Sequence, residues 1–274
     1  MLTVNLFDSA FAHLGPSGCS VHGKIAKRIQ YVRSNLRWDG ITILTDAMLC
    51  DSRTLDFLKS RVTIGWLLEP REYKPENYAR AEVLLPRLDL LLTHDQRLLD
   101  SYPDKCRFTP FAGCWIPESH WGLHPKTARV VQILSGKMFM EGHRLRHEVM
   151  ARFPEVDCHG WGTARGRFPH KETVLASAEF CVVIENSRAP NFWTEKLLDP
   201  MAVGCIPIFW GCPNLSQWFN MDGVIQFESI DDLPAILANL DYSRHVGAAR
   251  DNLERMKPFA CTDDWIAEHV LENL

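Results

Sequence analysis

The feature that most constrains the fold is the stretch 179–215, in which two apolar runs enclose a polar loop and a segment with helical signals. Residues 180–184 are Phe, Cys, Val, Val and Ile, a run typical of a strand covered on both faces in a parallel sheet. Gly204 ends the helical segment, and residues 206–210 resume an apolar run. The stretch therefore predicts a strand, a loop, a helix and a second strand. Its loop would lie at the carboxyl edge, where open α/β sheets bind ligands.

The polar loop carries candidate ligand groups at the start of the predicted helix. Thr194 is the expected N-cap, which puts Glu195 and Lys196 in the first helical turn. A lysine there opposes the helix dipole, which favours anions, so a bound anion would remove the conflict. Lysine and unpaired backbone N–H groups together predict a diphosphate site. The alternative is a solvated Glu–Lys pair on a surface helix.

The rest of the chain alternates predicted strands and helices, which indicates parallel sheets. The predicted strands are residues 2–7, 41–45, 62–68, 88–93, 130–134 and 156–159, and the first two are separated by a loop at 10–23 and a helix at 24–36. The Pro- and Trp-containing stretch 108–125 breaks this rhythm. We therefore expect an N-terminal domain over 1–122, a C-terminal domain over 123–262, and a last helix within 263–274 that packs back on the N-terminal domain.

Composition excludes several classes of protein. The chain has 274 residues, 46% hydrophobic and 23% charged, with a net charge of −4, which suits two globular domains. It has no basic run, so neither nucleic acid nor an anionic membrane surface is an expected partner. None of the nine cysteines is spaced C-x-x-C, which favours free thiols in a reducing compartment. The start lacks a signal-peptide pattern and no run approaches the ~18 apolar residues of a membrane span, so we expect a cytoplasmic protein.

Arg144 is a second candidate for phosphate binding. It opens a predicted helix at 142–151 after a Gly-containing loop, a geometry that aims a guanidinium and backbone N–H groups at a phosphate. A plain surface arginine is the alternative, and Arg146 is expected to point elsewhere. His143 and His147 share the spacing of a zinc-binding helix, but no third ligand is in register, so we expect no metal site.

Two further patterns are open to two interpretations. Gly160 begins a glycine-containing turn over 160–166, which resembles a phosphate-cradling loop but misses the dinucleotide spacing by one residue. It is either a turn near a nucleotide or a plain turn. Glu69 follows the predicted strand 62–68 and precedes Pro70, so its carboxylate is a candidate general base. A charged residue that merely ends a strand is the alternative.

The stretch 179–215 resembles the α1,3/1,4-fucosyltransferase family, glycosyltransferase family 10. That family's signature is a strand, then E-N-S, a short loop, Y-x-T-E-K, a helix and G-x-x-P-x-x-x-G. In this chain the signature is represented by Glu185, Asn186, Ser187, Phe192, Trp193, Thr194, Glu195, Lys196, Gly204, Pro207 and Gly211. The resemblance extends to Arg144 and to the WLLEP segment at 66–70, which looks like the segment that carries the family's catalytic glutamate.

The resemblance implies an α/β fold of the GT-B type, in which two Rossmann-like domains face each other across a cleft. It implies inverting transfer of fucose from GDP-fucose to a hydroxyl of a glycan acceptor, with no metal and no other cofactor. Glu69 would be the general base, and Arg144 and Lys196 would bind the diphosphate. Glu195 and Asn186 would hold ribose or sugar hydroxyls. The other donor-side candidates are Gly160, Glu185, Ser187, Phe192 and Thr194.

The chain departs from the family at two positions. Phe192 replaces the family's usual tyrosine, which removes one hydroxyl contact, and Pro200 lies inside a helix that normally has no proline. Because no membrane anchor or stem is seen, we expect a compact bacterial or virus-encoded form. Two alternatives stay open: the same scaffold using another GDP- or UDP-sugar, and a catalytically inactive module that binds a nucleotide or a sugar.

Overall fold

The computed structural model describes residues 1–8, 26–111, 113–160, 162–163 and 165–274. The chain forms two compact units: unit 1 comprises Met1–Gly113, Pro190–Phe192 and Cys261–Leu274, and unit 2 comprises Cys114–Ala189 and Trp193–Ala260. The division after Gly113 precedes the boundary expected at 122. The loop expected at 10–23 lies outside the described residues.

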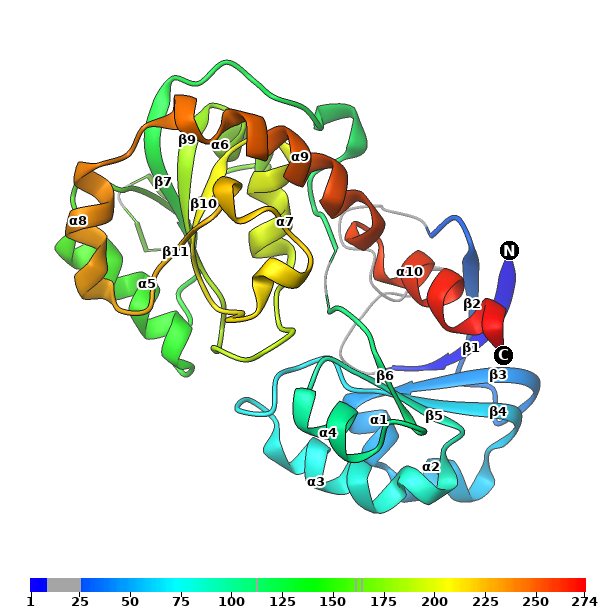
Figure 1. Ribbon diagram of the computed structural model, residues 1–274. Coiled ribbons are helices and arrows are strands. Elements are labelled where there is room, and N and C mark those ends of the chain that lie inside the picture. The colour runs from blue at the N-terminus through cyan, green and yellow to red at the C-terminus, as the bar shows by residue number, and fades with distance from the viewer. Residues whose placement is uncertain (9–25, 112, 161, 164) are drawn as a thin grey trace. The chain divides into compact units, whose positions relative to one another are not determined.

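In the described part of unit 1, parallel strands form one six-stranded sheet in the order β2-β1-β3-β4-β5-β6 (Figure 1). The strands are β1 (Leu2–Phe7), β2 (Ile29–Arg33), β3 (Arg37–Thr45), β4 (Lys59–Trp66), β5 (Leu90–Thr93) and β6 (Cys106–Phe108). One face packs against α1 (Asp46–Cys50), α2 (Ser52–Phe57), α3 (Pro75–Leu84) and α4 (Gln96–Ser101). The other face packs against α10 (Thr262–His269), so the C-terminal helix completes the core of unit 1.

The helix expected at 24–36 is wrong, because residues Ile29–Arg33 form β2, which pairs in parallel with β1. Ile29 and Tyr31 are buried while Gln30 between them is exposed. This alternation has the period of a strand, and β-branched and aromatic residues favour a pleated surface. Pairing with β1 therefore prevails over the weak helical periodicity of the segment.

Unit 2 contains, in its described residues, a five-stranded parallel sheet in the order β11-β10-β9-β7-β8. The strands are β7 (Ala128–Leu134), β8 (Asp157–Gly160), β9 (Ala178–Ile184), β10 (Ile206–Trp210) and β11 (Ile225–Gln226). The helices are α5 (Glu141–Arg152), α6 (Glu172–Leu175), α7 (Glu195–Ala202), α8 (Leu233–Ala238) and α9 (Val246–Met256). Residues of α5 and α8 share a core with alternate residues of β9, and α7 lies on the opposite face of the sheet (Figure 1).

The predicted fold class, α/β with parallel sheets, is confirmed in both units. The strand, loop, helix and strand expected over 179–215 are β9, the loop that follows it, α7 and β10. Within the described residues, eight cysteines are free thiols. None of the helices in the described part of the chain combines the length and apolar character that a bilayer span needs.

Candidate active site

The carboxyl end of β9 and the start of α7 are joined by a buried carboxylate. Glu185 is fully buried, and its Oε1 accepts hydrogen bonds from the Thr194 backbone N–H at 2.8 Å and from the Thr194 hydroxyl at 3.0 Å. Burial raises the pKa of Glu185, and the nearby Lys196 opposes this. Glu185 therefore fixes the shape of the loop, and its carboxylate faces inward.

The first turn of α7 concentrates opposite charges. Thr194 caps the helix, with its Oγ1 accepting the Lys196 backbone N–H at 3.3 Å. The Lys196 ammonium lies 3.0 Å from Glu195 Oε1 and 3.7 Å from Glu185 Oε2, and the side chain is still 26% exposed. Burial would raise the pKa of Glu195, but Lys196 and Lys171 lower it to about 2. Lys196 is thus partly neutralised and still open to a ligand.

A second half-buried lysine, Lys171, extends this charged cluster. Lys171 Nζ lies 2.6 Å from Asp199 Oδ2 and 3.9 Å from Glu195 Oε1, and it sits 3.9 Å from the centre of the Trp115 ring. Asp199 is 1% exposed, and its Oδ1 accepts the Trp115 backbone N–H at 2.6 Å. Burial would lower the pKa of Lys171, but Asp199 and Glu195 raise it, so the amine stays protonated.

Sequence reasoning missed Lys171 and Asp199. The available signal was the spacing of Asp199 four residues after Glu195, which puts two carboxylates on one face of α7. A buried carboxylate requires a cation, so a partner for Asp199 was to be expected. The identity of that partner depends on tertiary packing, because Lys171 lies 28 residues away in the chain.

The two arginines of α5 have different surroundings. Arg146 is 5% exposed, and its Nε and Nη2 donate to the carbonyl of Ile184 at 2.8 and 2.6 Å. Nη2 also donates to Asn186 Oδ1 at 2.9 Å, so this arginine orients the asparagine of the E-N-S triplet. Arg144 is exposed, and its Nη1 donates to the Phe139 carbonyl at 3.2 Å. The role predicted for Arg144 stays a prediction, and sequence reasoning missed the contact of Arg146 with the E-N-S triplet.

Two glycines allow the backbone to approach Glu185 closely. The Gly142 N–H at the start of α5 donates to the Asn186 carbonyl at 3.1 Å, and a Cβ on Gly142 would lie 1.6 Å from the Glu185 carbonyl oxygen. A Cβ on Gly211, after β10, would lie 2.9 Å from Glu185 Cγ. Gly204 ends α7 with φ of +65°, a left-handed conformation that glycine adopts without strain.

Three other predicted residues have separate environments. Ser187 is 4% exposed, and its Oγ has no hydrogen-bond partner among the described residues. The Gly160 N–H donates to the Gly166 carbonyl at 2.9 Å, so the glycine turn closes on itself; Trp161 and Ala164 of this turn lie outside the described residues. Phe192 belongs to unit 1, where its ring lies 4.9 Å from that of His94.

Glu69 lies in unit 1, in the turn that follows β4 at the carboxyl edge of that sheet. It is half-buried, and its backbone carbonyl accepts a hydrogen bond from the Tyr78 hydroxyl at 2.7 Å. Open α/β sheets bind ligands in the crevice outside the carboxyl ends of their strands. The position therefore suits a carboxylate that meets a substrate.

The histidines of α5 have protein partners. His143 is buried and its Nδ1 accepts the Met140 backbone N–H at 3.2 Å, while His147 Nε2 lies 3.0 Å from the Ser135 carbonyl. Burial, with help from Arg146, lowers the pKa of His143 to about 4. Within the residues that the structure describes, no group of three or more His, Cys, Asp or Glu side chains could hold a metal ion.

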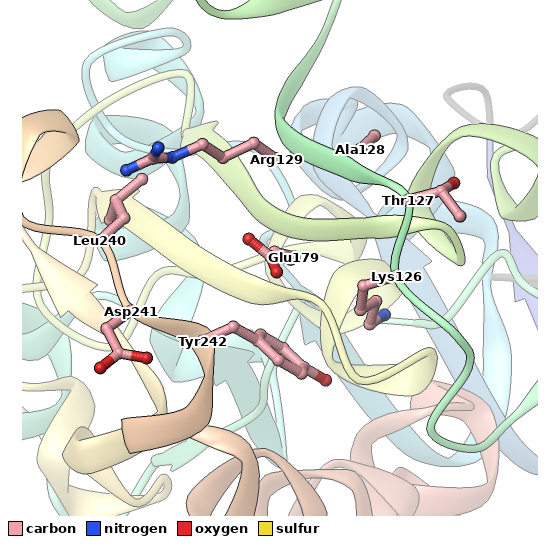
Figure 2. A pocket seen from close by; sticks show the side chains of 8 residues that line it. All are labelled: Lys126, Thr127, Ala128, Arg129, Glu179, Leu240, Asp241 and Tyr242. Atoms are coloured by element: carbon pink, nitrogen blue, oxygen red, sulfur yellow. The ribbon is translucent and has the colours of Figure 1, made fainter.

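A polar hollow lies at the opposite edge of the unit 2 sheet, beside the amino ends of β7 and β9 (Figure 2). Its volume is about 360 Å³, and it is lined by Lys126, Thr127, Ala128, Arg129, Glu179, Leu240, Asp241 and Tyr242. The Lys126 amine in this hollow already donates to the carbonyls of Ala176 and Val203, both at 2.9 Å. The hollow includes none of the predicted site residues.

Comparison with known proteins supports the resemblance of the C-terminal part to the family. Residues 123–246 match the sequence profile of the family described as glycosyltransferase family 10 (fucosyltransferase) C-term. This stretch is therefore similar to the C-terminal domain of that fucosyltransferase family, and the family resemblance expected from the E-N-S and T-E-K motifs is confirmed.

Curated relatives share short stretches with the chain. GDP-fucose protein O-fucosyltransferase 3 of Xenopus laevis is 32% identical over 72 residues, which cover 25% of this chain and 15% of that protein. Alpha-(1,3)-fucosyltransferase B of Drosophila melanogaster is 39% identical over 44 residues, which cover 16% of this chain and 10% of that protein. The chain thus spans a small part of the length of these relatives.

Solved structures share the fold. A crystal structure of an alpha1,3-fucosyltransferase has a TM-score of 0.54 at 16% identity, covering 83% of this chain and 73% of that one. The Anabaena protein HepE in complex with UDP has a TM-score of 0.60 at 8% identity, covering 90% of this chain and 86% of that one. At such identities the likeness concerns the fold, and it confirms the GT-B class.

Proposed function

We propose that the chain transfers fucose from GDP-fucose to a hydroxyl of a glycan acceptor, with inversion at the sugar carbon and without a required metal. The observation that carries the proposal is the partly exposed Lys196 at the start of α7, within the region that matches the fucosyltransferase family. A solved alpha1,3-fucosyltransferase with GDP-fucose has a TM-score of 0.50 to this chain at 15% identity, which supports the fold for such a donor.

The diphosphate of the donor binds at the start of α7. The backbone N–H groups and the dipole at a helix N-terminus attract its negative charge. The Lys196 ammonium adds a full positive charge at the same place. The exposed Arg144 guanidinium adds a second cation from the first turns of α5. These fixed cations offset the charge that develops on the leaving diphosphate, which is the role a metal has in other transferases.

The acceptor hydroxyl loses its proton as it attacks. The acceptor oxygen bonds to the fucose C1, the bond from C1 to the diphosphate oxygen breaks, and the proton passes to the Glu69 carboxylate. Inversion follows because attack and departure occur on opposite faces of C1. Asn186, whose amide oxygen accepts a hydrogen bond from Arg146, and Glu195 bind hydroxyls of the ribose or the sugar in this proposal.

Turnover is tested by measuring GDP release from GDP-fucose with a panel of oligosaccharide acceptors. Glu69→Gln should lose turnover and retain GDP affinity, whereas Glu72→Gln, at an exposed position in the same turn, should retain both. Wild-type turnover in Glu69→Gln would refute the assignment of the base. Retained GDP binding with no turnover by wild type on any acceptor would favour an inactive binding module.

The donor and the metal are tested separately. GDP should raise the melting temperature and UDP should not; stabilisation by UDP alone would point to a UDP-sugar, the alternative that the likeness to the UDP complex of HepE favours. Treatment with a chelator should leave turnover intact. Complete loss that a divalent cation restores would show that the metal-free mechanism is wrong.

A further inference from the structure

The turn that carries Glu69 is held at three consecutive residues. The Leu67 N–H donates to the Leu92 carbonyl at 2.9 Å, which continues the ladder between β4 and β5. The Leu68 N–H donates to Asp46 Oδ1 at 3.0 Å. The Glu69 carbonyl accepts the Tyr78 hydroxyl at 2.7 Å. Side chains outside the turn therefore restrain the peptide group between Leu67 and Leu68 and the peptide group that follows the Glu69 Cα.

Asp46 makes its contact at a conformational cost. It follows β3 directly and has φ of +34°, a left-handed conformation that is uncommon for a residue with a side chain. The residue is 5% exposed, and burial raises its pKa to about 7, with Glu69 and Asp8 adding to the effect. Strained residues and buried acids persist when the surrounding structure imposes them, and they gather at functional sites.

Tyr78 is itself fixed by its neighbours. Its ring is fully buried, and the Arg71 guanidinium lies 4.4 Å from the ring centre. Arg71 is held by two hydrogen bonds to Asp95, from Nε at 2.9 Å and from Nη2 at 2.8 Å. The hydroxyl also lies 3.5 Å from His94 Nε2. The Tyr78 hydroxyl is therefore a rigid donor to the Glu69 carbonyl.

We infer that Asp46 and Tyr78 are positioning residues for the Glu69 carboxylate, which they act on through the backbone of residues 68 and 69. This inference rests on the proposed role of Glu69 as the general base. With the backbone held just before and just after Glu69, the Cα from which its side chain extends is kept in place. Such restraint matters because a displacement of about 1 Å can cost a catalytic step about a hundredfold.

The groups around Asp46 also predict a pH effect. Asp46 interacts electrostatically with four other titratable groups: Asp8 after β1, Glu69 after β4, Cys50 on α1 and Tyr78 on α3. An ionised Asp46 disfavours a second negative charge on Glu69. Because the pKa of Asp46 is about 7, its charge appears only near neutral pH, above the range in which a carboxyl ordinarily ionises. The rate profile should therefore change slope near pH 7, and Asp46→Asn should lose that change.

The test compares Asp46→Asn, Asp46→Ala and Tyr78→Phe with Tyr102→Phe, a matched control at a partly exposed tyrosine of unit 1. Asparagine keeps an oxygen that accepts the Leu68 N–H, whereas alanine does not. We expect kcat to fall roughly 10- to 100-fold in Tyr78→Phe and Asp46→Ala and less in Asp46→Asn. GDP affinity and the donor KM should change less than about twofold, because the turn belongs to unit 1. The change of slope near pH 7 should be absent in Asp46→Asn and present in Tyr78→Phe.

The outcomes separate this inference from the proposed function. Wild-type kcat in Tyr78→Phe and in both Asp46 variants, with Glu69→Gln inactive, would refute positioning and leave the base in place. Loss in Asp46→Asn as complete as in Glu69→Gln, in a folded protein that binds GDP, would make Asp46 the base and also refute positioning. Wild-type kcat in Glu69→Gln would instead refute the base. If Asp46→Ala does not fold, Tyr78→Phe and Asp46→Asn decide the question.

Discussion

Lys196 and Glu195, adjacent in the sequence, form an ion pair at the start of α7, with Nζ of the lysine 3.0 Å from Oε1 of the glutamate. The same ammonium donates to the Thr194 hydroxyl at 3.0 Å. A lysine that should be unfavourable in the first turn of a helix is thus stabilised by the carboxylates around it. Its remaining exposure leaves it able to contact an added anion.

Lys196→Ala should weaken GDP binding by about 1–3 kcal/mol, the usual cost of losing a charged hydrogen bond. Calorimetry with GDP measures this loss directly. Lys257→Ala is the matched control, since Lys257 is an exposed lysine of unit 2 that pairs with Glu254. Equal GDP affinity in wild type and Lys196→Ala would remove the lysine from the donor site.

Substitutions of Arg144 and Arg146 should have different effects: the first should weaken GDP binding, and the second should lower the free energy of unfolding. Arg146→Lys loses the paired contact with the Ile184 carbonyl and should lower the free energy of unfolding by about 2 kcal/mol, because a buried cation is left with fewer hydrogen bonds. Arg144→Ala should leave stability within about 0.5 kcal/mol, as is usual for exposed positions, and weaken GDP binding. Denaturant unfolding and calorimetry on both variants check the prediction; the reverse pattern would contradict it.

The strand, loop and helix around 179–215 could be predicted because each local signal agrees with the fold: a buried apolar run, the Thr194 cap and the Gly204 terminator. The role of Arg146 could not. Side chains two residues apart on a helix point about 200° apart, so the choice between Arg144 and Arg146 depends on which face of α5 meets β9. That face is set by packing, which the spacing of charged residues alone does not reveal.

The edge strand β2 shows the opposite limitation. Its residues Ile29–Arg33 carry a short alternation that competes with a helical pattern over a longer window. Parallel pairing with β1 makes this segment a strand. Because β1 is more than twenty residues away in the sequence, the local propensity of residues 29–33 does not reveal the pairing. The pairing of Lys171 with Asp199 was hidden for the same reason, since the two residues meet only in the folded unit.

The Glu195 carboxylate should make the free energy of unfolding depend on pH. The folded protein holds its pKa at about 2, whereas the usual value is 4.5, so the carboxylate stabilises the fold above pH 4.5 and that contribution is lost as the pH falls toward 2. The full contribution is at most about 3 kcal/mol. Urea unfolding of wild type and Glu195→Gln at pH 6 and pH 3 measures it. The gap between the two proteins should narrow at pH 3; a constant gap would contradict the ion-pair origin.

Asp46 should have the opposite pH dependence. Burial raises its pKa from 3.8 to about 7, so its ionisation opposes folding and stability is lost as the pH rises through 7. Asp46→Asn should therefore be more stable than wild type at pH 8, by at most about 4 kcal/mol, and similar to it at pH 4. Melting temperatures at the two pH values check this. A variant less stable than wild type at pH 8 would show that the carboxylate is a net stabilising group.

Gly142→Ala should disrupt the junction between α5 and the E-N-S triplet. The added Cβ would lie 1.6 Å from the Glu185 carbonyl oxygen, so α5 or the end of β9 must shift, and the hydrogen bond from the Gly142 N–H to the Asn186 carbonyl is strained. We expect a loss of about 1–3 kcal/mol or more in unfolding free energy, the usual cost of steric overpacking, and weaker GDP binding. Gly247→Ala is the control, because nothing lies within 4 Å of a Cβ at that position in α9. It should be neutral or stabilising by up to about 1 kcal/mol, since alanine restricts the unfolded chain. Equal stability of the two variants in urea unfolding would show that the start of α5 does not need a glycine.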